Sequence, residues 1–278
     1  MNKKNTLYVS DLDGTLLNHE AKISLYTKNT INSLINKGLN FSVATARALD
    51  PTLKMLDGMK LSIPIILLNG VLIYDTNSKE YIKVNRIEPQ HVETIINTIS
   101  KYNITGFMYE LKNNGDFLTY HDTAKNVEIP KYILDRINKY KSIQPPNGLI
   151  DVSKENIVYF TLIDTPENLH PIYEFVSKIS GLKQEFYKNV YNPDFWFLEI
   201  FSEHSSKKLA VEFLKKQYLF SQVVGFGDNN NDIPLFESCN IKVAVSNATQ
   251  NLKEIADYIC ESNDDDGVTK WLEQHFVD

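Results

Sequence analysis

The sequence has little cysteine and no excess of positive charge. Its two cysteines, Cys239 and Cys260, belong to no CxxC or other metal-ligand spacing, which argues against a disulfide framework and against a zinc site. The 29 basic side chains are outnumbered by 35 acidic ones, giving a formal charge of -6. A chain with this balance has no overall positive field to attract nucleic acid or an anionic membrane surface. We therefore expect no nucleic-acid partner.

Long hydrophobic segments are also missing. The longest apolar stretch, residues 63–74, is too short to span a bilayer and is interrupted by Asn69 and Gly70. Near the N-terminus, Asp11 and Asp13 occur before a secretory hydrophobic segment could form. We therefore expect a cytoplasmic protein that does not associate with membranes.

The hydrophobic content is that of a globular protein, with 42% hydrophobic and 11% aromatic residues in 278. This is enough for one large domain or two modest ones, and it excludes disorder, collagen and coiled coil. Residues 6–82 alternate between short β-rich runs, at residues 6–10, 41–44 and 65–68, and helical segments, the first of which Ser24 would cap. The same alternation returns from residue 206 onward, with a helix near residues 233–237. Such alternation is typical of a parallel sheet with helices packed on it. We predict an α/β fold with a doubly wound, mainly parallel core sheet formed by residues 1–82 and 191–278.

The middle of the chain has a different pattern. Residues 83–190 mix helical segments with strands that are rich in aromatic residues, as in an α+β module. Because this segment interrupts the parallel pattern, we predict that it forms an inserted α+β domain.

Two carboxylates follow the first predicted strand, in the segment Asp11-Leu12-Asp13-Gly14-Thr15. In open α/β sheets, ligands bind where the strands end, and glycine allows a tight turn beside a ligand. The segment therefore indicates a functional site at this edge of the sheet. The alternative is that Asp11 and Asp13 only cap the turn that follows.

A second acidic segment, residues 227–232, follows the predicted strand at residues 222–226 and contains Asp228 and Asp232. If these acids converge with those of the first segment, each close pair repels by about 4 kcal/mol at 4 Å with an effective dielectric constant near 20. A hard divalent cation with oxygen ligands compensates this charge most simply, and Mg²⁺ is typical when a phosphate shares the ion. The alternative is an ordinary Asn/Asp turn that opens a helix.

Residues that could bind an anion lie at two further element ends. Thr45 follows the second predicted strand, and it offers a hydroxyl group beside backbone N–H groups such as that of Ala46. Lys207 begins a predicted helix, where the helix dipole alone disfavours a cation, so a bound anion or nearby carboxylates would explain its position. Lys208 is adjacent, and the sequence leaves open which of the two ammonium groups points into the site.

In this order, the four elements resemble the motifs of the haloacid dehalogenase superfamily of phosphotransfer enzymes. The Asp-x-Asp-Gly-Thr segment resembles the first motif, Thr45 the second, Lys207 the third and residues 227–232 the fourth. Other short segments resemble the Cof-type branch, in which a cap domain is inserted between the second and third motifs: residues 44–47, 68–70, 247–248 and 266–268. Ala46 departs from that branch, which usually has glycine there.

The resemblance implies a fold and a set of residue roles. The fold is a Rossmann-like core with an inserted C2-type (C2B) cap. Asp11 would be the nucleophile and Asp13 the general acid and base. Mg²⁺ would be held by Asp11, by the backbone carbonyl of Asp13 and by Asp228, with Asp232 supporting the metal indirectly. The phosphoryl oxygens would be bound by Thr45, Ala46, Lys207 and Asn231.

The implied function is a Mg²⁺-dependent phosphatase that hydrolyses a small phosphorylated metabolite, a sugar phosphate or a phosphorylated cofactor, through an aspartyl-phosphate. Dehalogenases of this fold lack both the metal and the acid that Asp13 supplies here, so dehalogenation is disfavoured. The alternatives are a phosphomutase, or a non-catalytic phosphoacceptor or phosphate-binding protein on the same fold. Asp13 disfavours a phosphoacceptor, because a second acid hastens hydrolysis of the acyl phosphate. We expect a monomer or a weak homodimer.

Overall fold

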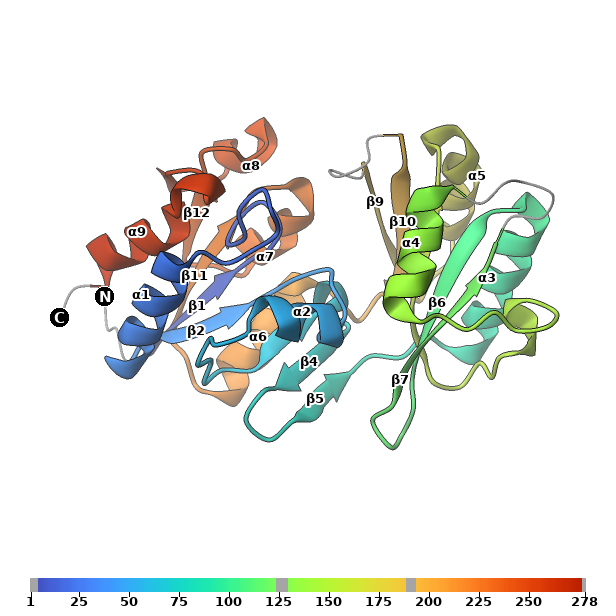
Figure 1. Ribbon diagram of the computed structural model, residues 1–278, viewed down its shortest axis with the longest axis horizontal. Coiled ribbons are helices and arrows are strands. Elements are labelled where there is room, and N and C mark those ends of the chain that lie inside the picture. The colour runs from blue at the N-terminus through green and yellow to red at the C-terminus, as the bar shows by residue number, and fades with distance from the viewer. Residues whose placement is uncertain (1–4, 124–129, 189–193, 277–278) are drawn as a thin grey trace. The chain divides into compact units, whose positions relative to one another are not determined.

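The computed structural model describes residues 5–123, 130–188 and 194–276. The chain divides into two compact units (Figure 1). The first unit combines two segments that are distant in the sequence, Met1–Lys83 and Ser206–Asp278, and the second unit is the segment between them, Val84–Ser205.

The first unit contains the parallel strands of the fold. Its N-terminal segment forms β1 (Thr6–Ser10), α1 (Leu25–Asn36), β2 (Asn40–Val43), α2 (Leu49–Met55), β3 (Ile65–Leu67), the 3₁₀ turn η2 (Leu68–Gly70), β4 (Leu72–Asp75) and β5 (Glu80–Val84). Its C-terminal segment forms α6 (Lys207–Gln217), β11 (Gln222–Gly227), the 3₁₀ turn η4 (Asn230–Asp232), α7 (Ile233–Glu237), β12 (Ile241–Val245), α8 (Gln250–Glu254), β13 (Tyr258–Cys260), the 3₁₀ turn η5 (Asn263–Asp265) and α9 (Gly267–His275).

Five parallel strands form the central sheet in the order β13-β12-β11-β1-β2. From β1 the chain continues to β2 on one side, and from β11 it continues to β12 on the other. The strand order therefore reverses between β1 and β11, which is the place where open α/β sheets bind ligands. This arrangement confirms the prediction of a doubly wound, mainly parallel core sheet.

Local sequence signals account for the helices beside this sheet. Ser24 caps α1, its side-chain oxygen accepting a 2.9 Å hydrogen bond from the backbone N–H of Thr27. Ser206 caps α6 in the same way, accepting a 3.0 Å bond from Leu209. Both caps satisfy N–H groups that the first turn of a helix otherwise leaves unpaired. α1 packs against α9 and α6 against α7, so the apolar strands between them are buried.

The third predicted strand belongs to a different sheet. We expected residues 65–68 to extend the parallel sheet, but β3 joins a separate three-stranded sheet in the order β3-β4-β5 and pairs antiparallel with β4. A single parallel bridge, between Ala44 and Ile66, connects it to the end of β2. The expectation was wrong in this respect because a continuous apolar run indicates burial on both faces and does not indicate which strand lies alongside.

The second unit is an α+β module, as predicted. Its five-stranded sheet is antiparallel, in the order β7-β6-β8-β10-β9. Its elements are α3 (Pro89–Tyr102), β6 (Thr105–Leu111), β7 (Phe117–Asp122), α4 (Lys131–Tyr140), the 3₁₀ turn η3 (Leu149–Asp151), β8 (Ile157–Asp164), α5 (Pro166–Val176), β9 (Leu182–Lys188) and β10 (Trp196–Ser202). One hydrophobic cluster joins α3 and α5 to the sheet, and it includes Ile95, Ile172, Phe160 and Leu198.

The second boundary of this unit lies later than expected. The sequence suggested that the core resumes at residue 191, a position outside the described residues. The structure places β10 in the second unit, because that strand pairs with β8 and β9. β9 is the strand directly before β10, whereas β8 is separated from β10 by α5 and β9, and the sequence pattern shows neither pairing.

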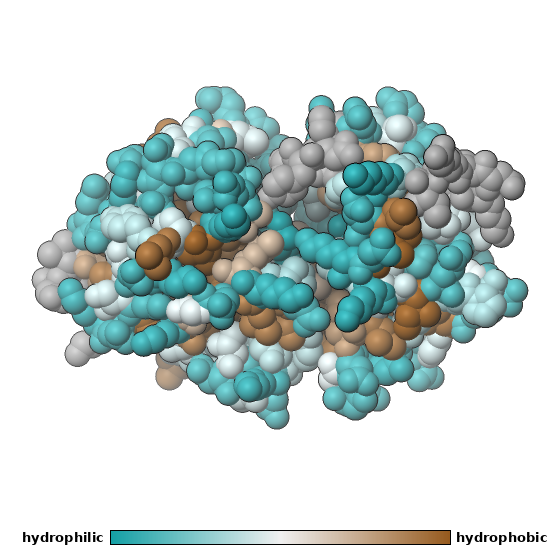
Figure 2. Space-filling view, viewed as in Figure 1, coloured by the Kyte–Doolittle hydropathy of each residue, from teal (hydrophilic) through white to brown (hydrophobic). Residues whose placement is uncertain are grey.

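Polar residues cover most of the surface on the face shown in Figure 2, and hydrophobic residues reach it in small patches. Within the described parts of the chain, every helix is too short or too polar to cross a bilayer.

Candidate active site

The two acidic segments meet at the end of the parallel sheet. Ser10 of β1 lies opposite Phe226 of β11, and the backbone N–H of Asp11 donates a 3.0 Å hydrogen bond to the Phe226 carbonyl. Asp11, which is 5% exposed, therefore leaves β1 beside the turn that carries Asp228. Parallel register thus brings together two carboxylates that are far apart in the sequence.

The turn after β1 is shaped to receive Asp228. Gly14 has a φ of +79°, and a Cβ atom there would lie 2.5 Å from Oδ2 of Asp228. The Thr15 hydroxyl donates a 2.9 Å hydrogen bond to Oδ1 of the same carboxylate. Both the positive φ and the close approach require glycine at position 14. Gly14 was predicted to allow a tight turn beside a ligand, and the group it lies against is the Asp228 carboxylate. The contact of Thr15 with Asp228 was not predicted from the sequence.

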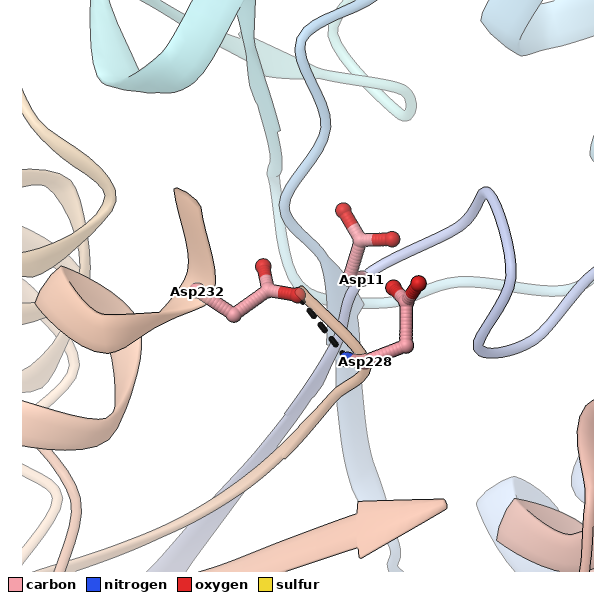
Figure 3. Close-up of side chains that lie close together, drawn as sticks. All are labelled: Asp11, Asp228 and Asp232. Carbon is pink, nitrogen blue, oxygen red and sulfur yellow. Dashed lines mark hydrogen bonds between the residues drawn. The ribbon is translucent and has the colours of Figure 1, made fainter. Parts of the chain in front are cut away.

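Asp232 is fully buried in η4, and its Oδ2 accepts backbone hydrogen bonds from Asp228 at 3.0 Å and Asn229 at 3.2 Å. Figure 3 shows the Asp11, Asp228 and Asp232 side chains entering one region, with the bond between Asp228 N and Asp232 dashed. One carboxylate oxygen from each of these three residues lies within 4.8 Å of the other two. We call them the three-carboxylate group.

Lys207 supplies the positive charge beside this group. Its side chain is only 1% exposed, and its Nζ donates 2.6 Å hydrogen bonds to Oδ1 of Asp11 and to Oδ1 of Asp232. The neighbouring Lys208 pairs with Glu237 in solvent instead, at 3.2 Å. Lys207 is therefore the lysine that points into the site, and the carboxylates explain its place at a helix N-terminus.

The charges of the group are unbalanced. Burial raises the pKa of Asp11 well above its ordinary value, Lys207 opposes this rise, and the Asp232 and Asp228 carboxylates add to it. Burial, and then the negative charge of Asp232, raises the pKa of Asp228 to about 7. Three acids share one ammonium group, so the site favours either bound protons or a further cation.

The donor set fits a hard divalent cation. Carboxylate oxygens are the ligands that Mg²⁺ and similar ions take in proteins, and this group brings together three of them, from buried Asp11 and Asp232 and half-buried Asp228. The side chain of Asp13 lies outside the group, because it pairs with Arg47 at 2.5 Å. That position agrees with the expectation that Asp13 would contribute only its backbone carbonyl, which stays a prediction.

The expected phosphate-binding residues lie around the same strand ends. Thr45 is 1% exposed and follows β2, where its backbone N–H donates to Ile66 and its hydroxyl oxygen accepts from the N–H of Arg47. Ala46 is half-buried beside it, and Asn231 is half-buried in the same turn as Asp232. Their proposed contacts with a phosphoryl group stay predictions.

Arg47 is the charged residue whose side-chain role sequence reasoning missed. Its guanidinium contacts Asp13 through two hydrogen bonds, at 2.5 and 2.6 Å. A signal was available, because the chain has arginine at only three positions, 47, 86 and 136. In a lysine-rich sequence, an arginine two residues after Thr45 therefore indicates a position where a guanidinium is required.

Comparison with known proteins identifies the family of the chain. Residues 8–272 match the model of the haloacid dehalogenase-like hydrolase family. The chain is 24% identical over 284 residues to the 5-amino-6-(5-phospho-D-ribitylamino)uracil phosphatase YitU of Bacillus subtilis (strain 168), covering 99% of both chains.

Solved structures are similar to this chain over nearly its whole length. The crystal structure of TM0651 from Thermotoga maritima is similar with a TM-score of 0.78 and 28% identity, covering 98% of each chain. A haloacid dehalogenase-like hydrolase from Bacteroides thetaiotaomicron shares the fold, with a TM-score of 0.78, 23% identity, and coverage of 97% of this chain and 98% of that one.

Proposed function

Because the chain belongs to the haloacid dehalogenase-like hydrolase family, we propose that it is a Mg²⁺-dependent phosphatase that acts on a small phosphorylated metabolite through an aspartyl-phosphate on Asp11. The family and the phosphatase names of its relatives make the chain a phosphatase enzyme. The metal, the substrate class and the covalent intermediate are the parts that we propose.

The observation that supports this proposal most is the convergence of Asp11, Asp228 and Asp232 beside Lys207. Asp11 and Asp228, with the backbone carbonyl of Asp13, would hold the cation, and Asp232 would orient Lys207. Bound Mg²⁺ would supply positive charge that offsets the charge of the phosphoryl oxygens. A cation would also balance the charge of these three acids, two buried and one half-buried, which share a single lysine.

The covalent chemistry belongs to Asp11 and Asp13. An oxygen of the Asp11 carboxylate forms a bond to phosphorus while the ester bond breaks, and its electron pair leaves with the ester oxygen. Asp13 gives that oxygen a proton. Water then attacks the phosphorus of the aspartyl-phosphate and gives a proton back to Asp13, so phosphate leaves and both carboxyl groups return to their starting state.

The remaining polar groups would stabilise the transferred phosphoryl group. We assign this role to Lys207, to the hydroxyl of Thr45, to the backbone N–H of Ala46 and to Asn231. Donors aimed at the charge of a transition state contribute roughly 10²–10³ in rate each. The second unit would be the inserted cap domain of this family.

Hydrolysis of p-nitrophenyl phosphate by the purified full chain tests the proposal. We expect turnover with added Mg²⁺, loss of turnover with EDTA, and a fall of at least about 10³-fold in Asp11→Asn. Glu20→Gln, an amide substitution at an exposed acid that pairs with Lys22, is the matched control and should leave the rate unchanged. Full activity in Asp11→Asn would disprove the nucleophile assignment.

A substrate screen addresses the leaving group. Sugar phosphates, nucleotides, phosphorylated cofactors and 5-amino-6-(5-phospho-D-ribitylamino)uracil, the compound named for the relative, would be compared by kcat/KM for release of inorganic phosphate. We expect one class to exceed p-nitrophenyl phosphate. Formation of an isomeric phosphate ester with little free phosphate would indicate a phosphomutase instead.

A further inference from the structure

Arg47 and Asp13 form a two-pronged contact at the edge of the candidate site. Nε of Arg47 donates to Oδ2 of Asp13 at 2.6 Å, and Nη2 donates to Oδ1 at 2.5 Å. Both side chains are mostly buried, with 16% and 28% of their surface exposed. A planar guanidinium that engages both oxygens fixes the rotation of a carboxylate, which a lysine at the same place would not do.

The backbone of Arg47 is itself held in place. Its carbonyl accepts a 3.1 Å hydrogen bond from the N–H of Leu68, and the carbonyl of Thr45 accepts one of 3.0 Å from Asn69. The loop after β2 is therefore fastened at two points to η2. Because the backbone of Arg47 is held in place, its guanidinium can hold the Asp13 carboxylate in one position.

The turn that fastens this loop is strained and closely packed. Leu68 and Asn69 have φ values of +47° and +54°, in the left-handed region that costs most residues about 1 kcal/mol or more. Gly70 follows with a φ of +95°, and a Cβ atom there would collide with the backbone carbonyl of Ser206, the residue before Lys207. One turn thus supports the backbone at both cations of the site, Arg47 and Lys207. Strain of this kind persists where the surrounding structure fixes a functional geometry.

The Asp13 carboxylate must be held in a defined orientation because other carboxylates lie near it. It lies two residues from Asp11, and its negative charge contributes to raising the pKa of Asp11 and of Asp228. Its side chain is nevertheless outside the three-carboxylate group. The guanidinium of Arg47 accounts for this separation, since it neutralises the carboxylate and holds both of its oxygens.

We propose that Arg47 is a positioning residue, which holds the Asp13 carboxylate in one orientation, apart from the three-carboxylate group. When Asp13 takes up a proton, one of its oxygens keeps its hydrogen bond to the guanidinium and the other carries the proton, so Asp13 transfers protons and does not bind the cation. The inference rests on the proposed function, because proton transfer by Asp13 is part of it. Arg47 acts through Asp13, and its loss matters most when the leaving oxygen needs a proton.

The experiment compares Arg47→Gln with wild type on two substrates, by kcat/KM, which reports the steps up to ester cleavage. p-Nitrophenyl phosphate has a leaving group that departs without a proton, whereas glycerol phosphate has one that requires it. We expect kcat/KM to fall about 100-fold on glycerol phosphate and less than about 5-fold on p-nitrophenyl phosphate. Arg47→Lys should restore only part of the loss, because an ammonium group cannot engage both oxygens. Lys270→Gln, which removes a cation from an exposed pair with Glu261, is the matched control and should behave as wild type.

Two further measurements separate the proposal from other roles of Arg47. In an Asp13→Asn background, Arg47→Gln should cause no further loss on glycerol phosphate, since residues that act through one another are not additive. Mg²⁺ affinity, measured by titration calorimetry without substrate, should stay within about 3-fold of wild type or shift toward tighter binding, as expected when a fourth carboxylate is released.

Each contrary result has a distinct meaning. An equal loss on both substrates, or an additive loss in the Asp13→Asn background, would overturn the positioning role. Weaker inhibition by inorganic phosphate in Arg47→Gln would show that Arg47 binds the phosphoryl group instead. Failure of the wild-type chain to hydrolyse either ester with Mg²⁺ would overturn the proposed function itself, whatever the variants do.

Discussion

Each unit of this chain buries a carboxyl group whose pKa is raised to about 7, yet the two surroundings differ. In the first unit, burial and the neighbouring Asp232 raise the pKa of Asp228. In the second unit, burial raises the pKa of Glu199, and hydrogen bonds from Tyr159 and Tyr187 oppose this rise. The Tyr159 hydroxyl donates to Oε2 of Glu199 at 2.7 Å.

The cations beside the two acids also differ. Lys207 donates directly to two carboxylates of the first unit. Arg136 of the second unit lies over the rings of Phe107, Tyr140 and Phe197, and it donates to the hydroxyl of Tyr109 at 2.9 Å. Glu199 thus lies among tyrosine hydroxyl groups, while the charge of Glu185 on the paired strand adds to the rise of its pKa and the charge of Arg136 opposes it.

A raised pKa alone therefore does not identify a catalytic centre. Burial produces the same direction of shift in both places. What distinguishes the first unit is the convergence of several carboxylates whose repulsion requires a cation. We therefore interpret Asp228 as functional and Glu199 as a structural acid satisfied by its neighbours.

Among the substitutions that test the difference between the two units, Lys207→Met should have the largest effect on stability and activity. Removing the ammonium leaves Asp11 and Asp232 buried without their partner, which costs about 3–5 kcal/mol in the free energy of unfolding. This corresponds to a fall of roughly 10 °C in Tm, with loss of phosphatase activity. Lys208→Met, at the adjacent exposed pair, should change the free energy by less than about 1 kcal/mol. Thermal unfolding of both variants measures the difference, and equal losses would contradict the assignment of Lys207.

The second prediction concerns Mg²⁺ and pH. Because the pKa of Asp11 and of Asp228 is raised by folding, the folded metal-free protein keeps protons that the unfolded chain has released. These two groups therefore contribute most to the free energy of unfolding below the ordinary carboxyl pKa, near 4, and their contribution declines as pH rises through about 7, the pKa of Asp228. Mg²⁺ competes with these protons, so its stabilising effect should grow with pH.

Thermal unfolding with and without Mg²⁺ at pH 5, 6, 7 and 8 tests this coupling. At a concentration about 100 times the dissociation constant measured at pH 8, Mg²⁺ should stabilise the protein by about 2.7 kcal/mol at that pH, and much less at pH 5. An equal increment at every pH would show that the raised pKa values do not belong to the cation site. Glu199→Gln should leave the increment unchanged, because Glu199 belongs to the second unit.

The smallest expected effect is that of Glu199→Gln on stability. Glu199 has a folded pKa of about 7 against an ordinary value of 4.5. Loss of its proton should therefore lower the free energy of unfolding of the wild type by about 1.4 kcal/mol as pH rises from 6 to 8. Glutamine does not ionise, and its oxygen can still accept the hydrogen bond from Tyr159. Denaturant unfolding across this pH range should therefore show a flatter pH dependence in the variant, with activity on p-nitrophenyl phosphate retained. Loss of that activity would mean that Glu199 is not merely structural.

Much of the fold was predictable because its signals are local. The strand at residues 6–10, the serine cap of α1 and the helix at Ile233–Glu237 follow from short runs of sequence, and the structure confirms them. The placement of β3 was not predictable, since its apolar side chains indicate burial without specifying an antiparallel partner. The pairing of β10 with β8 likewise depends on strands that other elements separate, and its pairing with the preceding strand β9 has no turn signal that the sequence analysis used.

The site was predictable to a similar degree. Glycine at position 14 and acids at the two strand ends are enough to indicate a ligand site at the edge of the sheet, because each of these signals is local. The pairing of Arg47 with Asp13 was not foreseen, because nothing in the spacing of these residues shows that two different strand ends face one another across the turn.

Strand, turn and cap propensities act over a few residues, so local sequence is enough to predict which chemical groups stand at the ends of the parallel strands. Which cation pairs with which acid depends on tertiary packing: Lys207 contacts Asp11 across 196 positions of sequence, and Arg47 contacts Asp13 across 34. An ion pair depends on distance and burial, and both are set by how distant segments pack together.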